Sequence, residues 1–382
     1  MAMSKQIAHI IIGLNTGGAE IMLLRLISMY QGLPSYRHTL ISLTDKGTLG
    51  PKFEEIGVPV YALGLRNPLN LPIVLFRLWR LLRTINPDIV QTTMYHADFF
   101  GGIVARLAGL RKIIWCLHSN DMDFTGSNSS RHLFRLCARF SSLVPWRIIS
   151  VSQSGADIHR RVGYDASKLL VIPNGFDVQA LDPSTVDGDA FRQSLHLPEP
   201  ALLIGLVARF NEAKDIQTFV KAACLTTKTH PNAYFVLIGA GLDPNNKQLA
   251  TWIAENGLTD RIRLCGERQD IPQCLKALDL FMLSSRTEAF PTVIGEAMAM
   301  EKPCVATNVG DAAYLIDKYG SIAPPADASA LAAALERLLD LSPEERKTMG
   351  QGARQRIQEN FSKDVMLARY QALYDSATDN GA

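Results

Sequence analysis

Residues 284–298 read SSRTEAFPTVIGEAM, and this stretch places two glutamates, Glu288 and Glu296, on either side of a proline. Pro291 is tolerated only in the first turn of a helix, where its missing N–H group is not needed. We therefore expect a helix over residues 291–300, with Glu288 in the loop before it and Glu296 within it.

The start of this helix suits an anion. The N–H groups of Thr292 and Val293 have no acceptor within the helix, and the helix dipole favours negative charge at this end. The carboxylates of Glu288 and Glu296 can accept hydrogen bonds from hydroxyl groups on either side. The stretch therefore predicts a site for a phosphorylated, hydroxyl-rich ligand, and a nucleotide sugar has this layout of sugar, diphosphate and ribose.

The bulk composition indicates a globular protein with two domains. The chain has 382 residues, too many for one ordinary core, and 47% of them are hydrophobic and 20% charged. No apolar stretch is long enough to span a bilayer, and no signal peptide is expected. The six cysteines lack the spacing of a zinc site, so we expect reduced thiols in a cytoplasmic protein.

The net charge of +2 is unevenly distributed along the chain. Residues 1–182 carry 19 Lys and Arg against 12 Asp and Glu, whereas the remainder carries 20 against 25. The basic first half indicates an anionic partner there, which could be an acidic membrane surface, a lipid phosphate or a nucleic acid.

Short β-branched runs alternate with helical patterns, as in doubly wound parallel sheets, and this rhythm restarts near residue 200. We therefore expect two facing Rossmann-like α/β domains with a ligand cleft between them, at the carboxyl ends of the strands. The polar stretch 177–200 is the expected linker. The expected strands are residues 7–13, 38–43, 58–62, 88–92, 112–118, 147–152 and 169–173, then 202–208, 234–238, 261–264, 280–283 and 304–307.

Arg209 and Lys214 follow the strand expected at 202–208, just before a helix. A guanidinium fork and a compact ammonium at a strand end suit a diphosphate. The alternative is two solvated charges in a loop, but the Glu288 stretch in the same half of the chain favours the phosphate.

Gly17 and Gly18 join the first strand to the first helix, and paired glycines let the backbone approach a ligand closely. A tight strand–helix turn is the alternative. The surrounding residues are neither a Gly-x-Gly-x-x-Gly fingerprint nor a P-loop.

His118 ends another expected strand, where an imidazole could bond a sugar hydroxyl or a leaving phosphate, although a structural histidine is the alternative. Asp121 and Asp123 look like a metal-binding pair. Because Arg209 and Lys214 can neutralise a diphosphate, we expect no metal and no other cofactor, and we expect the two aspartates to be loop or capping residues.

Two basic and aromatic stretches could contact an anionic membrane, since such helices can lie on a lipid surface. Packing helices with a solvated basic face are the alternative. The first stretch, residues 72–83, carries Arg77, Arg80 and Arg83 on one stripe, with Phe76 and Trp79 elsewhere around the helix; the second carries Arg131, Arg135, Arg139, Trp146 and Arg147.

In combination these motifs resemble the retaining glycosyltransferases of family 4, which have the GT-B fold, over nearly the whole chain. The matching motifs are Gly17-Gly18-Ala19-Glu20, the boundary motif Asn174-Gly175-Phe176-Asp177, the Arg-x4-Lys pair Arg209 and Lys214, the Glu-x7-Glu motif from Glu288 to Glu296, and a later segment, residues 320–327, with Pro324-Pro325.

The resemblance implies an acceptor-binding domain at 1–177, a nucleotide-sugar-binding domain at 178–361 and a final helix, 362–382, that packs back on the first domain. It implies catalytic roles for His118, Arg209, Lys214 and Glu288. The implied donor-binding residues are Arg209 and Lys214 for the diphosphate, Glu288 for the sugar, the backbone of Phe290, Pro291, Thr292 and Val293 along sugar and phosphates, Glu296 for the ribose, Arg268 near the base, and Gly17 and Gly18 closing on the phosphates.

The implied reaction moves a sugar, with retention, from a UDP-hexose or UDP-N-acetylhexosamine to a lipid-linked saccharide or an envelope polysaccharide such as lipopolysaccharide. From the basic first half and the basic-aromatic stretches we expect peripheral contact of the first domain with an anionic membrane, in a cytoplasmic enzyme with no nucleic-acid partner. Three positions depart from the family pattern, because Ala208, Asp215 and Ala289 stand where glycines are usual.

Other classes of function remain open from the sequence alone. A nucleotide-sugar epimerase or hydrolase would act without an acceptor. A non-catalytic protein would bind a nucleotide sugar or an anionic lipid without turnover. A nicotinamide-dependent oxidoreductase is less favoured, because neither half has the complete glycine fingerprint.

Overall fold

The computed structural model describes residues 4–118 and 128–378, without the side chains of 128–130. The chain forms two compact units. Unit 1 comprises Met1–Asn174 and Met366–Ala382, and unit 2 comprises Gly175–Val365. The sequence placed the domain boundaries at 177/178 and 361/362.

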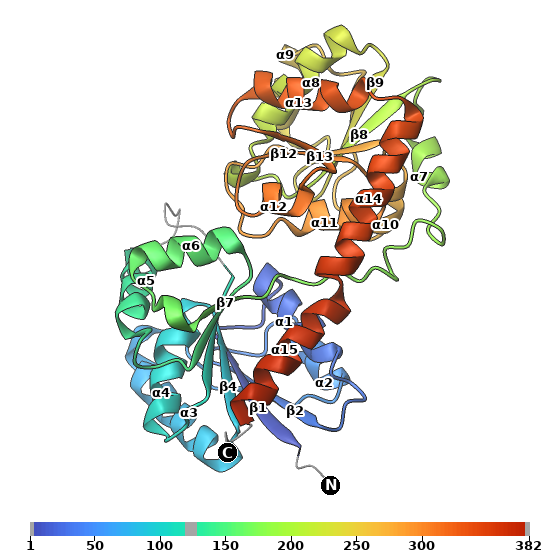
Figure 1. The fold of residues 1–382 in the computed structure, drawn as a ribbon. Helices are drawn as coiled ribbons and strands as arrows, with labels where there is room; N and C mark the ends of the chain where they lie inside the picture. Colours follow the sequence, from blue (N-terminus) through green and yellow to red (C-terminus); the bar gives the residue numbers. More distant parts are fainter. Residues whose placement is uncertain (1–3, 119–127, 379–382) are drawn as a thin grey trace. The chain divides into compact units, whose positions relative to one another are not determined.

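Unit 1 is built on a parallel sheet of seven strands in the order β3-β2-β1-β4-β5-β6-β7 (Figure 1). Its strands are β1 (Lys5–Ile11), β2 (Tyr36–Ser42), β3 (Val60–Ala62), β4 (Ile89–Thr93), β5 (Ile113–Leu117), β6 (Arg147–Ser150) and β7 (Leu169–Val171). Its helices are α1 (Gly18–Ser28), α2 (Gly50–Glu55), α3 (Leu71–Ile85), α4 (Gly102–Leu107), α5 (Asn128–Phe140), α6 (Gln153–Val162) and most of α15 (Lys363–Thr378).

Helices cover both faces of this sheet. Buried residues of α3, α4, α5 and α6 share one core with one face of the strands. Residues of α1 and α15 pack on the opposite face, where the Tyr374 hydroxyl of α15 donates a hydrogen bond to Gln91 Oε1 over 2.6 Å. The last helix of the chain is therefore an integral part of the first unit.

Unit 2 is built on a six-stranded parallel sheet in the order β10-β9-β8-β11-β12-β13. Its strands are β8 (Leu202–Val207), β9 (Ala233–Ile238), β10 (Ile262–Leu264), β11 (Leu280–Leu283), β12 (Cys304–Thr307) and β13 (Gly320–Ala323). Its helices are α7 (Asp189–Ser194), α8 (Ile216–Thr229), α9 (Lys247–Glu255), α10 (Ile271–Lys276), α11 (Thr292–Ala299), α12 (Ala312–Ile316), α13 (Ala328–Leu339) and α14 (Pro343–Phe361).

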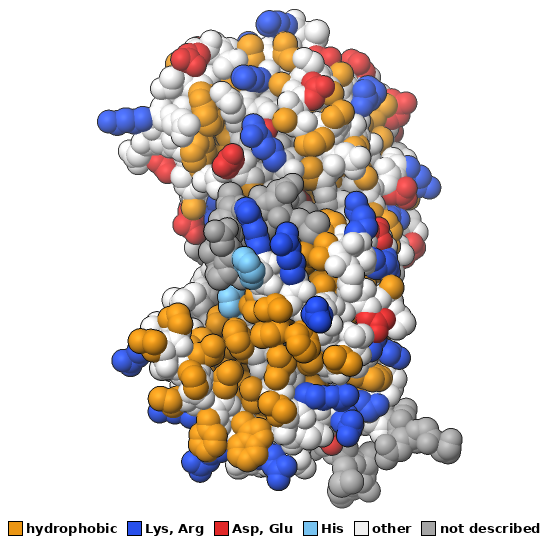
Figure 2. Space-filling model, turned by 90° about the vertical axis from the view of Figure 1, so that its left-hand side faces the viewer, with side chains coloured by type: hydrophobic (Ala, Val, Ile, Leu, Met, Phe, Trp, Pro, Cys, Tyr) orange, Lys and Arg blue, Asp and Glu red, His pale blue; other side chains and the backbone are white. Residues whose placement is uncertain are grey.

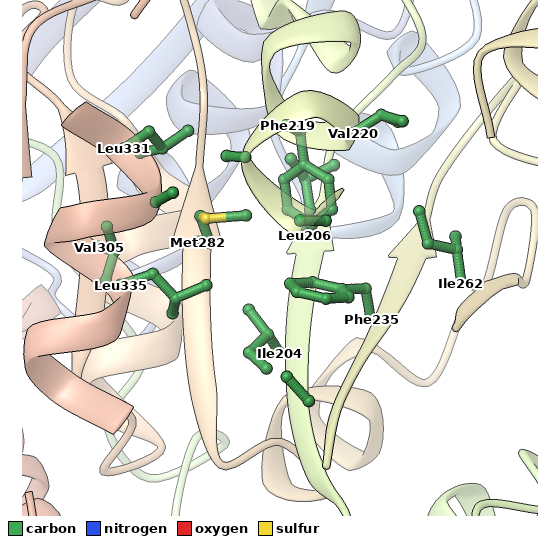
Figure 3. Close-up of a cluster of buried hydrophobic side chains, with 14 of the residues drawn as sticks. Ile204, Leu206, Phe219, Val220, Phe235, Ile262, Met282, Val305, Leu331 and Leu335 are labelled. Carbon is green, nitrogen blue, oxygen red and sulfur yellow. The ribbon is translucent and has the colours of Figure 1, made fainter. Parts of the chain in front are cut away.

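The core of unit 2 fixes its helices on the sheet. Figure 3 shows Phe219 of α8 beside Phe235 of β9, and Leu335 of α13 near Met282 of β11. The rings of Phe219 and Phe235 meet edge to face, with centroids 5.8 Å apart. Such interlocked aromatic contacts hold the strand ends, and the loops that leave them, in defined positions.

The prediction of two doubly wound α/β domains is confirmed, and each predicted strand is present with its ends shifted by at most two residues. The sequence analysis missed one strand, β13, which reads GSIA and pairs only with β12. Its single β-branched residue gives too weak a pattern to mark a strand.

The linker predicted at residues 177–200 is wrong, because this stretch belongs to unit 2 and contains α7. Phe191 of α7 is buried, and the guanidinium of Arg192 donates to the carbonyls of Ala277 and Ala201 over 2.8 and 2.7 Å. The buried apolar residues Leu181, Phe191 and Leu195 and the Arg192 side chain anchor this polar segment, which composition alone does not reveal.

The two sheets share a feature that locates binding sites in doubly wound folds. In each sheet the strand order reverses between two central neighbours, β1 and β4 in unit 1 and β8 and β11 in unit 2. Loops leaving the carboxyl ends of such a pair diverge and form a crevice where ligands bind.

Unit 1 should lose stability as the pH falls. Burial lowers the pKa of His9, His38, His118 and His159, to about 4 for the last three. These imidazoles stay neutral when folded but protonate near pH 6.5 when unfolded, so the free energy of unfolding decreases from about pH 6.5 toward pH 4. Each contributes up to about 1.4 kcal/mol per pH unit. Burial also lowers the pKa of His96, which adds to this trend, and raises the pKa of Asp98 and Glu20, which opposes it.

Hydrogen exchange of the β1 and β2 amides at about pH 7 and about pH 5 measures this change. We expect faster opening at the lower pH, after correction for intrinsic exchange. Equal opening free energies at both pH values would contradict the assignment of neutral buried histidines.

Candidate functional site

The residues predicted to bind an anion lie on two loops at the reversal point of the unit 2 sheet. One loop follows β8 and carries Arg209 and Lys214, and the other follows β11 and carries Glu288. Because β8 and β11 are paired, with Leu280 opposite Ile204, both loops leave the same edge of the sheet.

Backbone and side-chain bonds tie the two loops together. The Arg286 amide donates to the Ala213 carbonyl over 2.7 Å, and the hydroxyl of the buried Ser284 donates to the Lys214 carbonyl over 2.9 Å. Arg286 Nε also donates to Asp215 Oδ2 over 2.8 Å. The relative position of the cationic loop and the glutamate loop is therefore set by the protein before any ligand binds.

Lys214 and Glu288 form an ion pair across these loops, between Nζ and Oε1, and the Ser285 hydroxyl donates to the same Oε1 over 2.7 Å. The side chains are only 22% and 12% exposed, so the pair is partly shielded from water. An ammonium has three donors, and this contact uses one of them. Lys214 is thus oriented by Glu288 and keeps donors for an anion.

Arg209 supplies a second cation. Its side chain is exposed, and within residues 4–118 and 128–378 it forms no hydrogen bond or ion pair. Arg286, by contrast, is held by Asp215. Arg209 is the arginine of these loops that remains available for a ligand.

The predicted helix after Glu288 is present as α11, with Pro291 as its N-cap residue and Met300 as its C-cap residue. The ring of Phe290 is buried against Phe176 and Phe361, with ring centroids 6.0 Å apart in both cases. The first N–H groups of α11, at Thr292 and Val293, have no intrahelical acceptor. Phe290 therefore anchors a helix start whose free amides can bind an anion.

Gly295 of α11 has no side chain, and this lets the Phe176 ring pack closely against the helix. A Cβ atom at this position would lie 2.1 Å from the Phe176 ring, which is fully buried. Glu296 is half-buried on the same helix, and its role toward a ribose stays a prediction.

Arg268 contacts Asp270 and Phe191, and among the described residues it forms no hydrogen bond or ion pair with the Lys214–Glu288 pair. Its guanidinium donates in a fork to both carboxylate oxygens of Asp270, over 2.8 and 2.6 Å, and lies 4.9 Å from the ring centroid of Phe191. Asp270 thereby presents the arginine in one fixed orientation. The predicted contact with a base stays a prediction.

Two further residues shape this site: Gly310, which the sequence analysis missed, and Asp215, to which it assigned no role. Gly310, after β12, has a φ of +55°, and a Cβ there would lie 2.4 Å from the Glu288 carbonyl oxygen. Asp215 adopts a φ of +46°, and its carboxylate caps α8 through the Thr218 amide and hydroxyl. The departure from glycine at Asp215 was visible in the sequence, and aspartate is among the few residues that tolerate this conformation.

In unit 1, the predicted glycines lie at the start of α1, with Gly17 as its N-cap residue. A Cβ at Gly17 would lie 2.4 Å from Glu20 Oε2, whereas a Cβ at Gly18 would meet nothing within 4 Å. The backbone at Gly18 is therefore open, and the approach of this loop to phosphates stays a prediction.

His118 follows β5 and borders a small pocket with Gln91, Thr93, Asn174 and Tyr370. Burial lowers the pKa of His118 to about 4, so its imidazole is neutral near pH 7. It can exchange hydrogen bonds with a hydroxyl but offers no positive charge to a phosphate. Asp121 and Asp123 lie outside the described residues.

Comparison with known families agrees with the two-unit division. Residues 16–180 match the model described as Glycosyltransferase Family 4, and residues 187–356 match the model described as Glycosyl transferases group 1. Together these matches take in most of both units.

Two curated relatives are similar to this chain. One is UDP-Gal:alpha-D-GlcNAc-diphosphoundecaprenol alpha-1,3-galactosyltransferase of Escherichia coli, 30% identical over 238 residues, a match that covers 62% of this chain and 61% of that protein. The other is N,N'-diacetylbacillosaminyl-diphospho-undecaprenol alpha-1,3-N-acetylgalactosaminyltransferase of Campylobacter jejuni, 24% identical over 382 residues, which covers 96% and 98%.

Solved structures establish the fold. Anabaena Alr3699/HepE in complex with UDP superimposes with a TM-score of 0.85 at 22% identity, covering 97% of this chain and 100% of that chain. A glycosyltransferase from Rickettsia africae ESF-5 gives a TM-score of 0.83 at 20% identity, covering 99% and 100%. The expected GT-B fold is confirmed.

The free guanidinium and the oriented ammonium predict how substitutions affect anion binding. We expect Arg209→Ala to weaken binding of UDP roughly ten- to hundredfold, because a charge-assisted hydrogen bond is lost. The matched control is Lys228→Ala, which removes an exposed cation in the last turn of α8, at the end away from the loop of Arg209 and Lys214. This variant should bind UDP normally. Isothermal titration calorimetry measures both, and equal affinities of the two variants would contradict the diphosphate assignment.

Proposed function

The chain belongs to the glycosyltransferases of group 1 and family 4, and from this premise we propose that it transfers a sugar from a nucleoside-diphosphate sugar to an acceptor hydroxyl, with retention at the anomeric carbon. The arrangement in unit 2 carries the proposal. A free Arg209, a Lys214 oriented by Glu288, and the open start of α11 follow neighbouring strands at one edge of the sheet. These are the groups that a pyrophosphate and an adjoining sugar require.

The proposed chemistry is electrostatic. The bond between the anomeric carbon and the β-phosphate oxygen breaks, a bond from the acceptor oxygen to that carbon forms on the same face, and the acceptor proton passes to the departing phosphate. Negative charge grows on the β-phosphate during this step, so cations held in place beforehand lower the barrier. Arg209, Lys214 and the first amides of α11 take this role, and Glu288 accepts hydrogen bonds from the sugar.

Two cations and a helix start can balance the charge of a pyrophosphate, so our proposal needs no metal ion. Activity that persists in EDTA supports this part. Activity that disappears in EDTA and returns with Mg²⁺ or Mn²⁺ would replace it with metal-assisted departure of the phosphate.

For the donor we propose a UDP-hexose or UDP-N-acetylhexosamine. The names of similar proteins support this class, since one relative is a UDP-Gal galactosyltransferase and the Anabaena fold neighbour was solved with UDP and with UDP-glucose. The names of two relatives give saccharides on diphosphoundecaprenol as their acceptors. We therefore propose a lipid-linked saccharide as the acceptor and a cytoplasmic enzyme that works at the inner face of a membrane.

The decisive experiment is a panel of UDP-galactose, UDP-glucose, UDP-N-acetylgalactosamine, UDP-N-acetylglucosamine and GDP-mannose, each with and without undecaprenyl-diphosphate-linked saccharides. We expect one UDP-sugar to release UDP only when acceptor is present, and NMR of the product to show the anomeric configuration of the donor. Release of free sugar without acceptor would indicate a hydrolase, interconversion of donors an epimerase, and tight UDP binding without turnover a binding protein.

Substitution of the predicted catalytic side chains should separate chemistry from folding. We expect Arg209→Ala to reduce kcat/KM by about two orders of magnitude or more, comparable to the loss of a group that stabilises developing charge. Glu288→Gln keeps the shape but removes the charge that orients Lys214, so its kcat should also fall. Near-normal turnover in both variants, with Lys228→Ala as the reference, would contradict these roles.

A further inference from the structure

Helix α3 of unit 1 exposes apolar side chains opposite to those it buries. Val74, Leu78 and Leu82 face the core, and none of them is exposed. On the outside, Phe76 is 59% exposed, and Leu69, in the turn that leads into the helix, is 90% exposed. Burying a large apolar side chain is worth roughly 2 kcal/mol, so this face gains free energy from any apolar medium that covers it.

The exposed residues continue onto neighbouring elements. Of the ten large hydrophobic side chains that are exposed within the described residues, seven lie on or beside α3, α4 and α5: Leu69, Ile73, Phe76, Trp79, Leu107, Leu136 and Leu143. Figure 2 shows hydrophobic side chains gathered on this side of unit 1, with Lys and Arg around them. We call these seven residues the apolar face; gatherings of this kind mark interaction sites, whereas single exposed residues do not.

The charge around the apolar face has one sign. Arg66, Arg77, Arg80 and Arg83 are exposed on α3 and the turn before it, and no Asp or Glu occurs between Glu55 and Asp88. On α5, Arg131, Arg135 and Arg139 are exposed as well. Arginine beside aromatic residues is the composition of surfaces that bind anionic lipid, because each basic residue near such a surface strengthens binding.

The aromatic residues of α3 are arranged for the boundary between water and lipid. Phe76 and Trp79 stack with ring centroids 6.1 Å apart, and the Arg83 guanidinium lies 5.9 Å from the Trp79 ring centroid. Tryptophan prefers the headgroup level of a bilayer, and arginine can reach the phosphates there. Among the described helices none is long and apolar enough to cross a membrane, so α3 would lie on the surface.

The second basic stretch of the sequence contributes only in part. The arginines of α5 share this side of unit 1, but Trp146 is half-buried and packs with the core of α1 and α15. Lys112 Nζ and the Arg147 guanidinium carbon lie 4.6 and 4.7 Å from its ring centroid. Trp146 and Arg147 are therefore excluded from the apolar face.

We propose that the apolar face, with its arginines, docks unit 1 on an anionic lipid bilayer, with Phe76 and Trp79 inserted at headgroup depth. A second copy of the chain is a poorer occupant, because a two-fold contact of this face would bring arginine against arginine. The docking would bring the protein to a lipid-linked acceptor; this purpose rests on the proposed function, whereas the docking itself does not.

Sedimentation with vesicles tests the docking without any sugar donor. We expect the protein to bind vesicles of phosphatidylcholine mixed with phosphatidylglycerol, to bind pure phosphatidylcholine far less, and to be released by salt. Phe76→Ser/Trp79→Ser and Arg80→Gln/Arg83→Gln should each weaken binding about tenfold or more. The matched controls are Leu170→Ser, an exposed apolar residue of β7, and Lys221→Gln/Lys228→Gln, two exposed lysines of α8.

Two further readouts keep a negative result interpretable. UDP binding should be unchanged in all four variants, which shows that unit 2 is intact, and circular dichroism reports the fold of unit 1. Unchanged vesicle binding in Phe76→Ser/Trp79→Ser, equal losses in the controls, or a dimer in light scattering that these serines dissociate would each overturn the proposal. Failure of sugar transfer with normal vesicle binding would instead count against the proposed function alone.

Discussion

The ion pair between Lys214 and Glu288 is the interaction on which the candidate site depends. It joins the loops after β8 and β11, and the Ser285 hydroxyl and the backbone bond from Arg286 to Ala213 support it. Because the pair is partly buried, removing one partner would leave the other charge poorly compensated. The same contact that holds the loops together thus fixes a cation and a carboxylate side by side, where we propose that a phosphorylated sugar binds.

The two faces of helix α3 in unit 1 differ in the side chains that they carry. Facing the core, α3 is an ordinary packing helix, with aliphatic side chains at the spacing that a sheet requires. Facing away, it carries exposed aromatic residues that packing does not explain. Part of the positive charge of the basic first half therefore has a location in the fold, since exposed arginines of α3 and α5 lie around the apolar face, whereas the exposed Arg25 and Arg37 lie on α1 and β2.

Much of this fold could be predicted from the sequence, because buried parallel strands consist of short β-branched runs, which can be recognised without knowledge of the structure. β13 and α7 were missed for different reasons: β13 has a single β-branched residue, and α7 is held by Phe191, whose burial only tertiary contacts decide. The motif predicted the loop at Glu288 and the helix that follows it, but not that Lys214, 74 positions earlier, pairs with Glu288. That contact follows from strand order, which local pattern does not contain. The close approach of Gly310 to the Glu288 carbonyl also depends on strand order, since Gly310 follows a third strand, β12.

Phe176 has a consequence for the study of unit 2 as an isolated fragment. Its amide donates to the Phe361 carbonyl over 2.8 Å, and its ring fills the space beside Gly295 of α11, the helix whose start is part of the candidate site. A fragment cut at residue 187, where the family match begins, would lack this ring and leave a hole under α11. A fragment that starts at Gly175 and continues through Val365 retains the ring together with the Lys363–Asp177 ion pair. This longer fragment is therefore better suited to crystallisation or ligand screening.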